Sequence, residues 1–277
     1  MRVALVFVLA AMWSASARAD GLQDEVYLHP LDAFTAQTLH AGEVLYAQPV
    51  SPLPGWAQVG LTDDLTAEVD VTALLGGFFI APHLPVPSLD LRYRLHDGRR
   101  TGPSLAVEGM AQYLWHPYAQ EEFPTFRLVR DQLGGFLHVN ASIPLAEHLW
   151  IHLSAGASYA AVLAIQNQGR AVARQRVFRD LVSPDVSVSL DARWRPWLSV
   201  HVTGSYGATF VYADNQPRKL QLAYGFRVAP LRRSKHAILR DLRLEVAALV
   251  LYRRDARELQ ALYVPLLPYV YWQWQWN

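Results

Sequence analysis

The residues best suited to covalent chemistry in this chain are one histidine and the serines near it. His152 and Ser154 stand two positions apart, and Asn140 and Ser142 lie one short connection upstream. A serine becomes a nucleophile when an imidazole within hydrogen-bond reach takes its proton and a donor stabilises the developing oxyanion. These residues supply the parts of an acyl-transfer site, and the elements that carry them decide whether a substrate can reach them.

A second candidate set consists of titratable side chains at the polar positions of alternating segments. Such groups either select solutes by charge or neutralise one another in pairs. Antiparallel pairing across a short turn at 96–103 places Arg92 beside Glu108, and pairing across 76–87 brings it near Glu68. Asp191, Arg193 and His201 are expected as neighbours across Pro196-Trp197. The full set is Glu68, Asp70, Asp90, Arg92, Arg94, Glu108, Asp191, Arg193, Arg195, His201, Arg227, Arg243 and Glu245.

Other site chemistries find little support in the composition. The chain has no cysteine, which excludes disulfides, thiolate metal sites and cysteine nucleophiles. Its histidines are scattered without metal-ligand spacing, so neither a metal nor a cofactor is predicted. The formal net charge of +1 gives no support for nucleic-acid binding.

The elements that position these residues follow a period of two. Apolar residues at odd positions from Leu65 to Leu75 alternate with polar ones from Asp64 to Thr72, and similar alternation recurs to the carboxyl terminus. Successive side chains of a strand point to opposite faces, so each segment is predicted to be a strand with one apolar and one polar face. His152 and Ser154 fall on the polar face.

The chain of 277 residues is 52% hydrophobic and 18% charged, which is unusually apolar for a water-soluble protein. Residues 1–19 read as a secretory signal peptide with cleavage near Ala19. Beyond them no run of about 18 apolar residues occurs, so no helical membrane span is predicted.

The predicted strands favour a membrane barrel over a soluble sandwich. Many are about ten residues long, as tilted spanning strands are, and short links alternate with long ones. The short links are 61–64, 96–103, 144–149, 196–197 and 229–240, and the long ones include 76–87, 116–134 and 164–184. About twelve strands are expected, within a range of ten to fourteen.

Aromatic and basic residues mark the expected membrane boundaries. Aromatic girdles at both interfaces are typical of outer-membrane barrels. The girdle residues are Trp115, Tyr159, Trp194, Phe210, Tyr252, Trp272, Trp274 and Trp276. An outer loop carries four arginines: Arg170, Arg174, Arg176 and Arg179. They are suited to binding lipopolysaccharide phosphates or, if the loop folds inward, to attracting anions to the mouth of the barrel; a solvated loop is the alternative.

The signal peptide, the alternating strands and the aromatic final strand Tyr269–Trp276 together resemble a bacterial outer-membrane β-barrel protein over residues 43–277. The resemblance implies an all-β, transmembrane, antiparallel up-and-down barrel in the outer membrane of a Gram-negative bacterium. It also implies contact with outer-membrane lipid and recognition of the last strand by the barrel-assembly machinery. Asn277 after Trp276 departs from the usual aromatic end. A monomer is expected, and residues 20–42 form either a periplasmic extension or a small plug.

The function expected of such a barrel is a narrow pore for passive diffusion of small hydrophilic or charged solutes. An occluded structural or ligand-binding barrel is the first alternative, because the charges are balanced and can pair. A lipid-modifying enzyme similar to the twelve-stranded outer-membrane phospholipase is the second. Since His152 and Ser154 lie on the polar face near the short link 144–149, away from lipid, no enzymatic activity is predicted.

Overall fold

The structure is a computed structural model. It describes residues 34–49, 56–70, 85–98, 102–118, 128–167, 170–171, 181–195, 197–207, 219–253 and 264–275. The predicted signal peptide at 1–19 and its cleavage near Ala19 lie outside the described residues. None of the helices in the described ranges is long and apolar enough to span a membrane.

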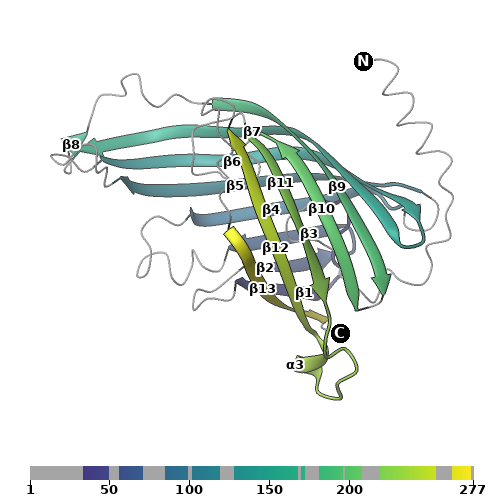
Figure 1. The fold of residues 1–277 in the computed structure, drawn as a ribbon. Coiled ribbons are helices and arrows are strands. Elements are labelled where there is room, and N and C mark those ends of the chain that lie inside the picture. The colour runs from purple at the N-terminus through teal and green to yellow at the C-terminus, as the bar shows by residue number, and fades with distance from the viewer. Residues whose placement is uncertain are drawn as a thin grey trace, which may run out of the picture.

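The described chain is almost entirely β-strand (Figure 1). One short helix, α3 (Ala237–Arg240), lies in the link between β11 and β12. The strands are β1 (Glu43–Pro49), β2 (Trp56–Thr62), β3 (Leu65–Asp70), β4 (Pro85–His96), β5 (Ser104–Tyr118), β6 (Leu128–Ala146), β7 (Leu149–Asn167), β8 (Arg170–Ala171), β9 (Leu181–Arg195), β10 (Leu198–Tyr206), β11 (Lys219–Val228), β12 (Leu242–Arg253) and β13 (Val264–Gln275).

The strands close into an antiparallel barrel. Each long strand pairs with its neighbour in the chain, and β1 pairs with β13 from Glu43↔Gln275 to Pro49↔Tyr269. The two-residue β8 pairs only with the end of β7, so twelve strands form the wall. The predicted all-β up-and-down barrel of twelve strands is confirmed.

The barrel is apolar outside and polar inside. On β4, Leu91 and Tyr93 are 43% and 52% exposed, whereas the alternate Arg92 and Arg94 are 8% and 7% exposed. A soluble sandwich buries its apolar face, so this inverted pattern excludes it. The outer surface is instead suited to contact with lipid.

Some strands are longer than the sequence predicts. β6 and β7 each have 19 residues and remain paired from Ala146↔Leu149 to Leu128↔Asn167. The predicted links 116–134 and 164–184 were therefore wrong in extent, because backbone pairing continues past the residues that alternate. Gly134 and Gly135 interrupt the alternation there without interrupting the ladder.

The five predicted short links all lie at one end of the barrel, which we call the turn end. The connections there are residues 63–64, 97–103, 147–148, 196–197 and 229–241. β1 begins and β13 ends at this same end, as their pairing shows. The residues directly before β1, Ala41 and Gly42, therefore lie at the turn end, where they contact Asp63 and Gly60.

Candidate functional site

The lumen is the candidate site, and its charges form two clusters. We call them the Asp191 cluster, on β7 and β9–β12, and the Glu108 cluster, on β4–β6. Their central residues are almost completely buried: Glu108 is 1% exposed, Asp191 and Arg227 are 0% exposed and Arg193 is 2% exposed. Charges buried this deeply require partners, because an unpaired ion in a low-dielectric site is strongly unfavourable.

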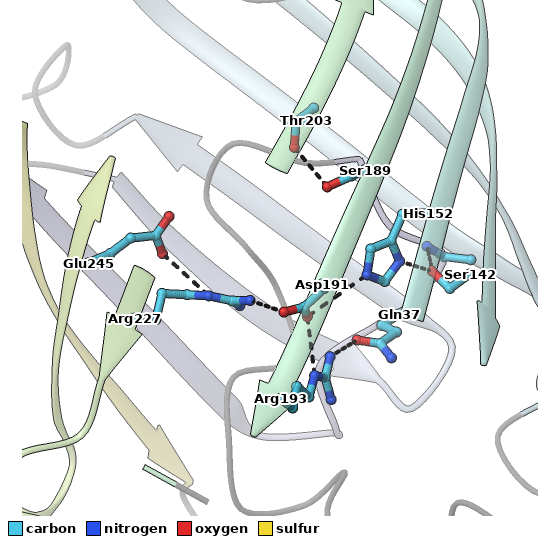
Figure 2. Close-up of polar contacts among 10 residues, drawn as sticks. Gln37, Ser142, His152, Ser189, Asp191, Arg193, Thr203, Arg227 and Glu245 are labelled. Atoms are coloured by element: carbon cyan, nitrogen blue, oxygen red, sulfur yellow. Dashed lines mark hydrogen bonds and ion pairs between the residues drawn. The ribbon is translucent and has the colours of Figure 1, made fainter. Parts of the chain in front are cut away.

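Asp191 is the centre of its cluster (Figure 2). Its Oδ1 lies 2.5 Å from Arg227 Nη2, and its Oδ2 lies 3.1 Å from Arg193 Nε. The same Oδ2 lies 3.9 Å from His152 Nε2. One carboxylate therefore faces two guanidinium groups and one imidazole.

The cluster continues across the wall to a second carboxylate. Arg227 Nε lies 4.0 Å from Glu245 Oε2, and His201 Nε2 lies 3.6 Å from Glu245 Oε1. His201 pairs in register with Asp191, as the short turn after β9 predicts. On the other side, the Arg193 guanidinium carbon lies 5.5 Å from the ring centre of Trp150, within cation–π range.

The Glu108 cluster is smaller. Arg92 pairs in register with Glu108, and its Nη2 makes a buried ion pair with Glu108 Oε1. Asn140 Nδ2 donates to the other carboxylate oxygen of Glu108. Glu68 pairs in register with Asp90 and accepts a hydrogen bond of 2.5 Å from Gln58 Nε2.

The structure places carboxylates beside guanidinium groups, Glu108 beside Arg92 and Asp191 beside Arg193 and Arg227. Register explains this arrangement, because oppositely charged residues on adjacent strands fall opposite or diagonal to one another.

Ser142 and His152 are brought together, with Asp191 behind them. Ser142 pairs in register with His152, and its Oγ lies 2.8 Å from His152 Nδ1. The resulting Ser–His–Asp line has the residue types of an acyl-transfer site. However, Ser142 is fully buried, and its Oγ already accepts a 2.8 Å hydrogen bond from the Ala36 backbone N–H. Ser154, 5% exposed, also faces the lumen.

Several predicted site residues lie away from the clusters. Arg94 is buried at the turn end, 2.8 Å from Asp64 and 3.5 Å from Asp97. Arg195 is exposed at the end of β9, and Arg243 Nη1 donates to the backbone carbonyl of Arg240. Both lie at the rim of the turn end, since Arg195 is the last residue of β9 and Arg243 is the second residue of β12. Asp70 lies in β3.

The predicted girdle and outer loop are only partly described. Tyr159 and Trp194 are 37% and 64% exposed, and Trp272 is half-buried on β13. Arg170 lies in β8. Trp115, Tyr252 and Trp274 lie in β5, β12 and β13. Phe210, Trp276, Arg174, Arg176 and Arg179 lie outside the described residues.

A basic hollow opens at the turn end. It has a volume of about 900 Å³ and is lined by Arg195, Trp197, Arg232 and Arg233 together with the segment Ala229–Leu231 and Ser234. None of the lining residues is acidic. A hollow lined by charge of one sign concentrates counter-ions at its mouth.

Sequence reasoning missed two groups of lumen residues. Asp185 on β9 is buried with His138 and Ser158, and its Oδ2 lies 3.4 Å from His138 Nε2. Pro184, next to Asp185, is typical of a loop, so Asp185 was not predicted to be a lumen residue. The second group precedes β1: Thr35, Ala36, Gln37, Thr38 and Leu39 are all at most 1% exposed. No sequence signal distinguishes it, since uncharged stretches of this length occur elsewhere, as from Leu45 to Thr62.

Among the described residues, no group of three or more histidine, aspartate or glutamate side chains is arranged to hold a metal ion. The residues gathered here present charged and hydrogen-bonding groups to the interior of the barrel.

Known proteins show only distant structural similarity to this chain. No protein-family model matches the chain, and no curated protein matches it. Among solved structures, OccAB4 of Acinetobacter baumannii is 10% identical with a TM-score of 0.30, over 85% of this chain and 72% of that one. OccD3 (OpdP) of Pseudomonas aeruginosa is 11% identical with a TM-score of 0.26, over 86% of this chain and 74% of that one.

The class of the protein rests on its own geometry. A closed antiparallel barrel with an even number of wall strands, an apolar outer surface and a charged lumen is the architecture of bacterial outer-membrane β-barrels. The chain folds as a barrel of this class, with twelve strands in its wall.

Proposed function

We propose that the protein is a narrow pore for passive diffusion of small hydrophilic or charged solutes across the outer membrane of a Gram-negative bacterium. The observation that carries this proposal is the inner wall, which presents arginine, carboxylate and histidine side chains from β4 to β12 while apolar side chains face outward. Such a lining offers charged and hydrogen-bonding groups to a polar solute in transit.

Strand number supports the same function. A barrel of about eight strands is just filled by its own side chains, and the diameter grows with each added strand. Twelve strands enclose a wider lumen than eight do. The ion pairs along this wall present fixed charges of both signs, and a charged solute can pair with them one after another as it passes.

The occluded barrel is the alternative that the burial of the clusters favours. Arg92, Glu108, Asp191 and Arg227 are at most 8% exposed, so the lumen is filled at their level. A pore therefore requires that a group which fills the lumen at this level can move out of the path. The described conformation corresponds to its closed state.

Planar-bilayer recordings of the refolded full chain test the pore. We expect discrete current steps with low open probability in the intact protein. Absence of current in the intact chain, and also in a variant whose lumen has been cleared, would support the occluded barrel instead.

We propose no catalytic role for Ser142 and His152. Burial of the serine and the Ala36 amide bound to its oxygen support a structural role for this pair. For the remaining surroundings we propose contact with outer-membrane lipid and lipopolysaccharide, recognition of β13 by the barrel-assembly machinery, and a monomeric state. The signal peptide, cleaved near Ala19, is proposed to deliver the chain there.

A further inference from the structure

The segment that precedes β1 lies inside the barrel. Phe34 contacts Phe136 and His138 in the middle of β6, Ala41 contacts Asp63 at the turn end, and Thr35–Leu39 between them are at most 1% exposed, so the segment runs through the lumen toward the turn end. A tight reversal joins this segment to the wall: the Glu43 N–H donates to the His40 carbonyl, and Gly42, with φ of 80°, donates to the Gly60 carbonyl. The segment and β1 are therefore adjacent in sequence but occupy the lumen and the wall respectively.

The backbone of this segment is held by wall side chains rather than by a β-ladder. The Ala36 N–H donates to Ser142 Oγ at 2.8 Å, and the Leu39 N–H donates to Thr66 Oγ1 at 2.9 Å. Buried backbone groups must find partners, and here β6 and β3, which are separated in the wall by β5 and β4, supply them.

Both charged clusters reach the same segment. Arg92 Nη1 donates to the Gln37 carbonyl at 3.3 Å, and Arg193 Nη2 lies 3.5 Å from Gln37 Oε1 (Figure 2). Asn140 Nδ2 lies 3.3 Å from the Thr35 carbonyl. One residue, Gln37, thus bridges the Glu108 cluster and the Asp191 cluster across the lumen.

Apolar contacts fix both ends of the segment. Leu39 packs in a buried cluster with Leu45, Ala47 and Ala229. At the other end, the Phe34 ring meets the Phe136 and His138 rings edge to face at 5.2 and 4.8 Å. Leu45 and Ala47 are apolar residues of β1 that face inward, against the general pattern, and the segment explains why.

We propose that Phe34–Leu39 is a plug that binds the two charged clusters and closes the lumen, so that solutes pass only when it leaves. This inference rests on the proposed pore function. The plug carries no charge of its own, so it can be buried without adding an ion to a set that is already paired. Its release would expose to solutes the same arginine and serine groups that hold it.

The absence of native cysteine allows the plug to be locked by one engineered disulfide. In Ala36→Cys/Ser142→Cys, whose parent residues are in hydrogen-bond contact, we expect oxidation to abolish current and a reductant to restore it. Leu39→Cys/Thr66→Cys provides a second pair should the first fail to fold. The matched control is Ser189→Cys/Thr203→Cys, whose parent hydroxyls lie 2.7 Å apart within the wall and do not involve the plug.

A second variant clears the lumen. Replacing residues 34–39 of the full chain by a Gly/Ser stretch of equal length should raise the open probability at least about tenfold. Labelling of Ser142→Cys by a water-soluble maleimide should accelerate in this background, because the plug no longer covers that position.

The outcomes separate the plug from the pore. Equal current in the oxidised and reduced forms of a cross-linked plug variant, with the cross-link verified by mass spectrometry, would overturn the plug. Unchanged labelling in the Gly/Ser variant would overturn it as well. Accelerated labelling without current in any form would show that the segment covers Ser142 but would overturn the pore, and the gating role with it.

Discussion

Arg227 Nη2 lies 2.5 Å from Asp191 Oδ1, and both side chains are completely buried inside the barrel. Asp191 also faces Arg193 and His152, so its carboxylate is the one negative group shared by these three. Removing one member of a buried ion pair leaves the others uncompensated.

Asp191→Asn should therefore destabilise the barrel strongly. The two arginines would repel each other without the carboxylate, and loss of one partner of a buried pair costs about 3–5 kcal/mol. Guanidinium unfolding in lipid vesicles, followed by tryptophan fluorescence, measures the free energy of unfolding. The control is Asp97→Asn, which removes an exposed partner of Arg94 at 3.5 Å and should cost about 0–1 kcal/mol. Equal losses in the two variants would contradict the central role of Asp191.

Asp63 should make the turn end sensitive to acid. The Ala41 N–H donates to Asp63 Oδ1 at 2.9 Å, and this bond, aided by His40, holds the pKa of Asp63 below its ordinary value of 3.8. A carboxyl whose pKa is depressed in the folded state stabilises that state above its unfolded pKa and loses the contribution as pH falls through the folded pKa. The reversal that leads from the plug into β1 should therefore loosen below a pH of about 3.8.

The measurement is the pH dependence of unfolding, compared between the intact protein and Asp63→Asn. The variant should lack the part of the acid-induced loss that Asp63 contributes. Parallel curves for the two proteins through this range would show that the contact has no effect on stability.

The basic hollow at the turn end should favour anions. Arg195 and Arg233 line it without an acidic neighbour in the lining, so they raise the local concentration of negative solutes. Arg195→Gln/Arg233→Gln should reduce the anion-to-cation permeability ratio about twofold or more. Reversal potentials in a salt gradient measure this ratio. Lys235→Gln removes a charge from the same link outside the hollow and should change it less.

Phospholipid hydrolysis should be at background in the intact protein. The Ser142 hydroxyl is buried and hydrogen-bonded to the Ala36 amide, so a lipid substrate has no route to it. His152→Ala should leave this background unchanged in a fatty-acid release assay on mixed micelles. Hydrolysis by the intact protein that disappears in His152→Ala would instead identify an enzyme.

Most of the wall could be predicted from the sequence, because alternation encodes which face of a strand meets lipid. β3, at Leu65–Asp70, lies within the stretch from Leu65 to Leu75 whose alternation predicts a strand. Short turns also fix the register, which is why Arg92↔Glu108 and Asp191↔His201 follow from the turn positions alone.

The contents of the lumen could not be predicted in the same way. Ala36 and Ser142 are 106 positions apart, and a segment without regular structure has no period that would reveal its partners. The inward-facing Leu45 and Ala47 contradict the polar-inside pattern locally, and only the contact with Leu39 accounts for them. For this reason the sequence left two alternatives for residues 20–42, a periplasmic extension and a small plug.

The pairing of β1 with β13 bears on how the protein is made. These strands come from the two ends of the barrel sequence, so the wall has an open side until the last strand is delivered. Because the reversal at His40–Glu43 ties the lumen segment to β1, that segment travels with the first strand of the seam. The position of the lumen segment is therefore coupled through the chain to the seam at which the barrel closes.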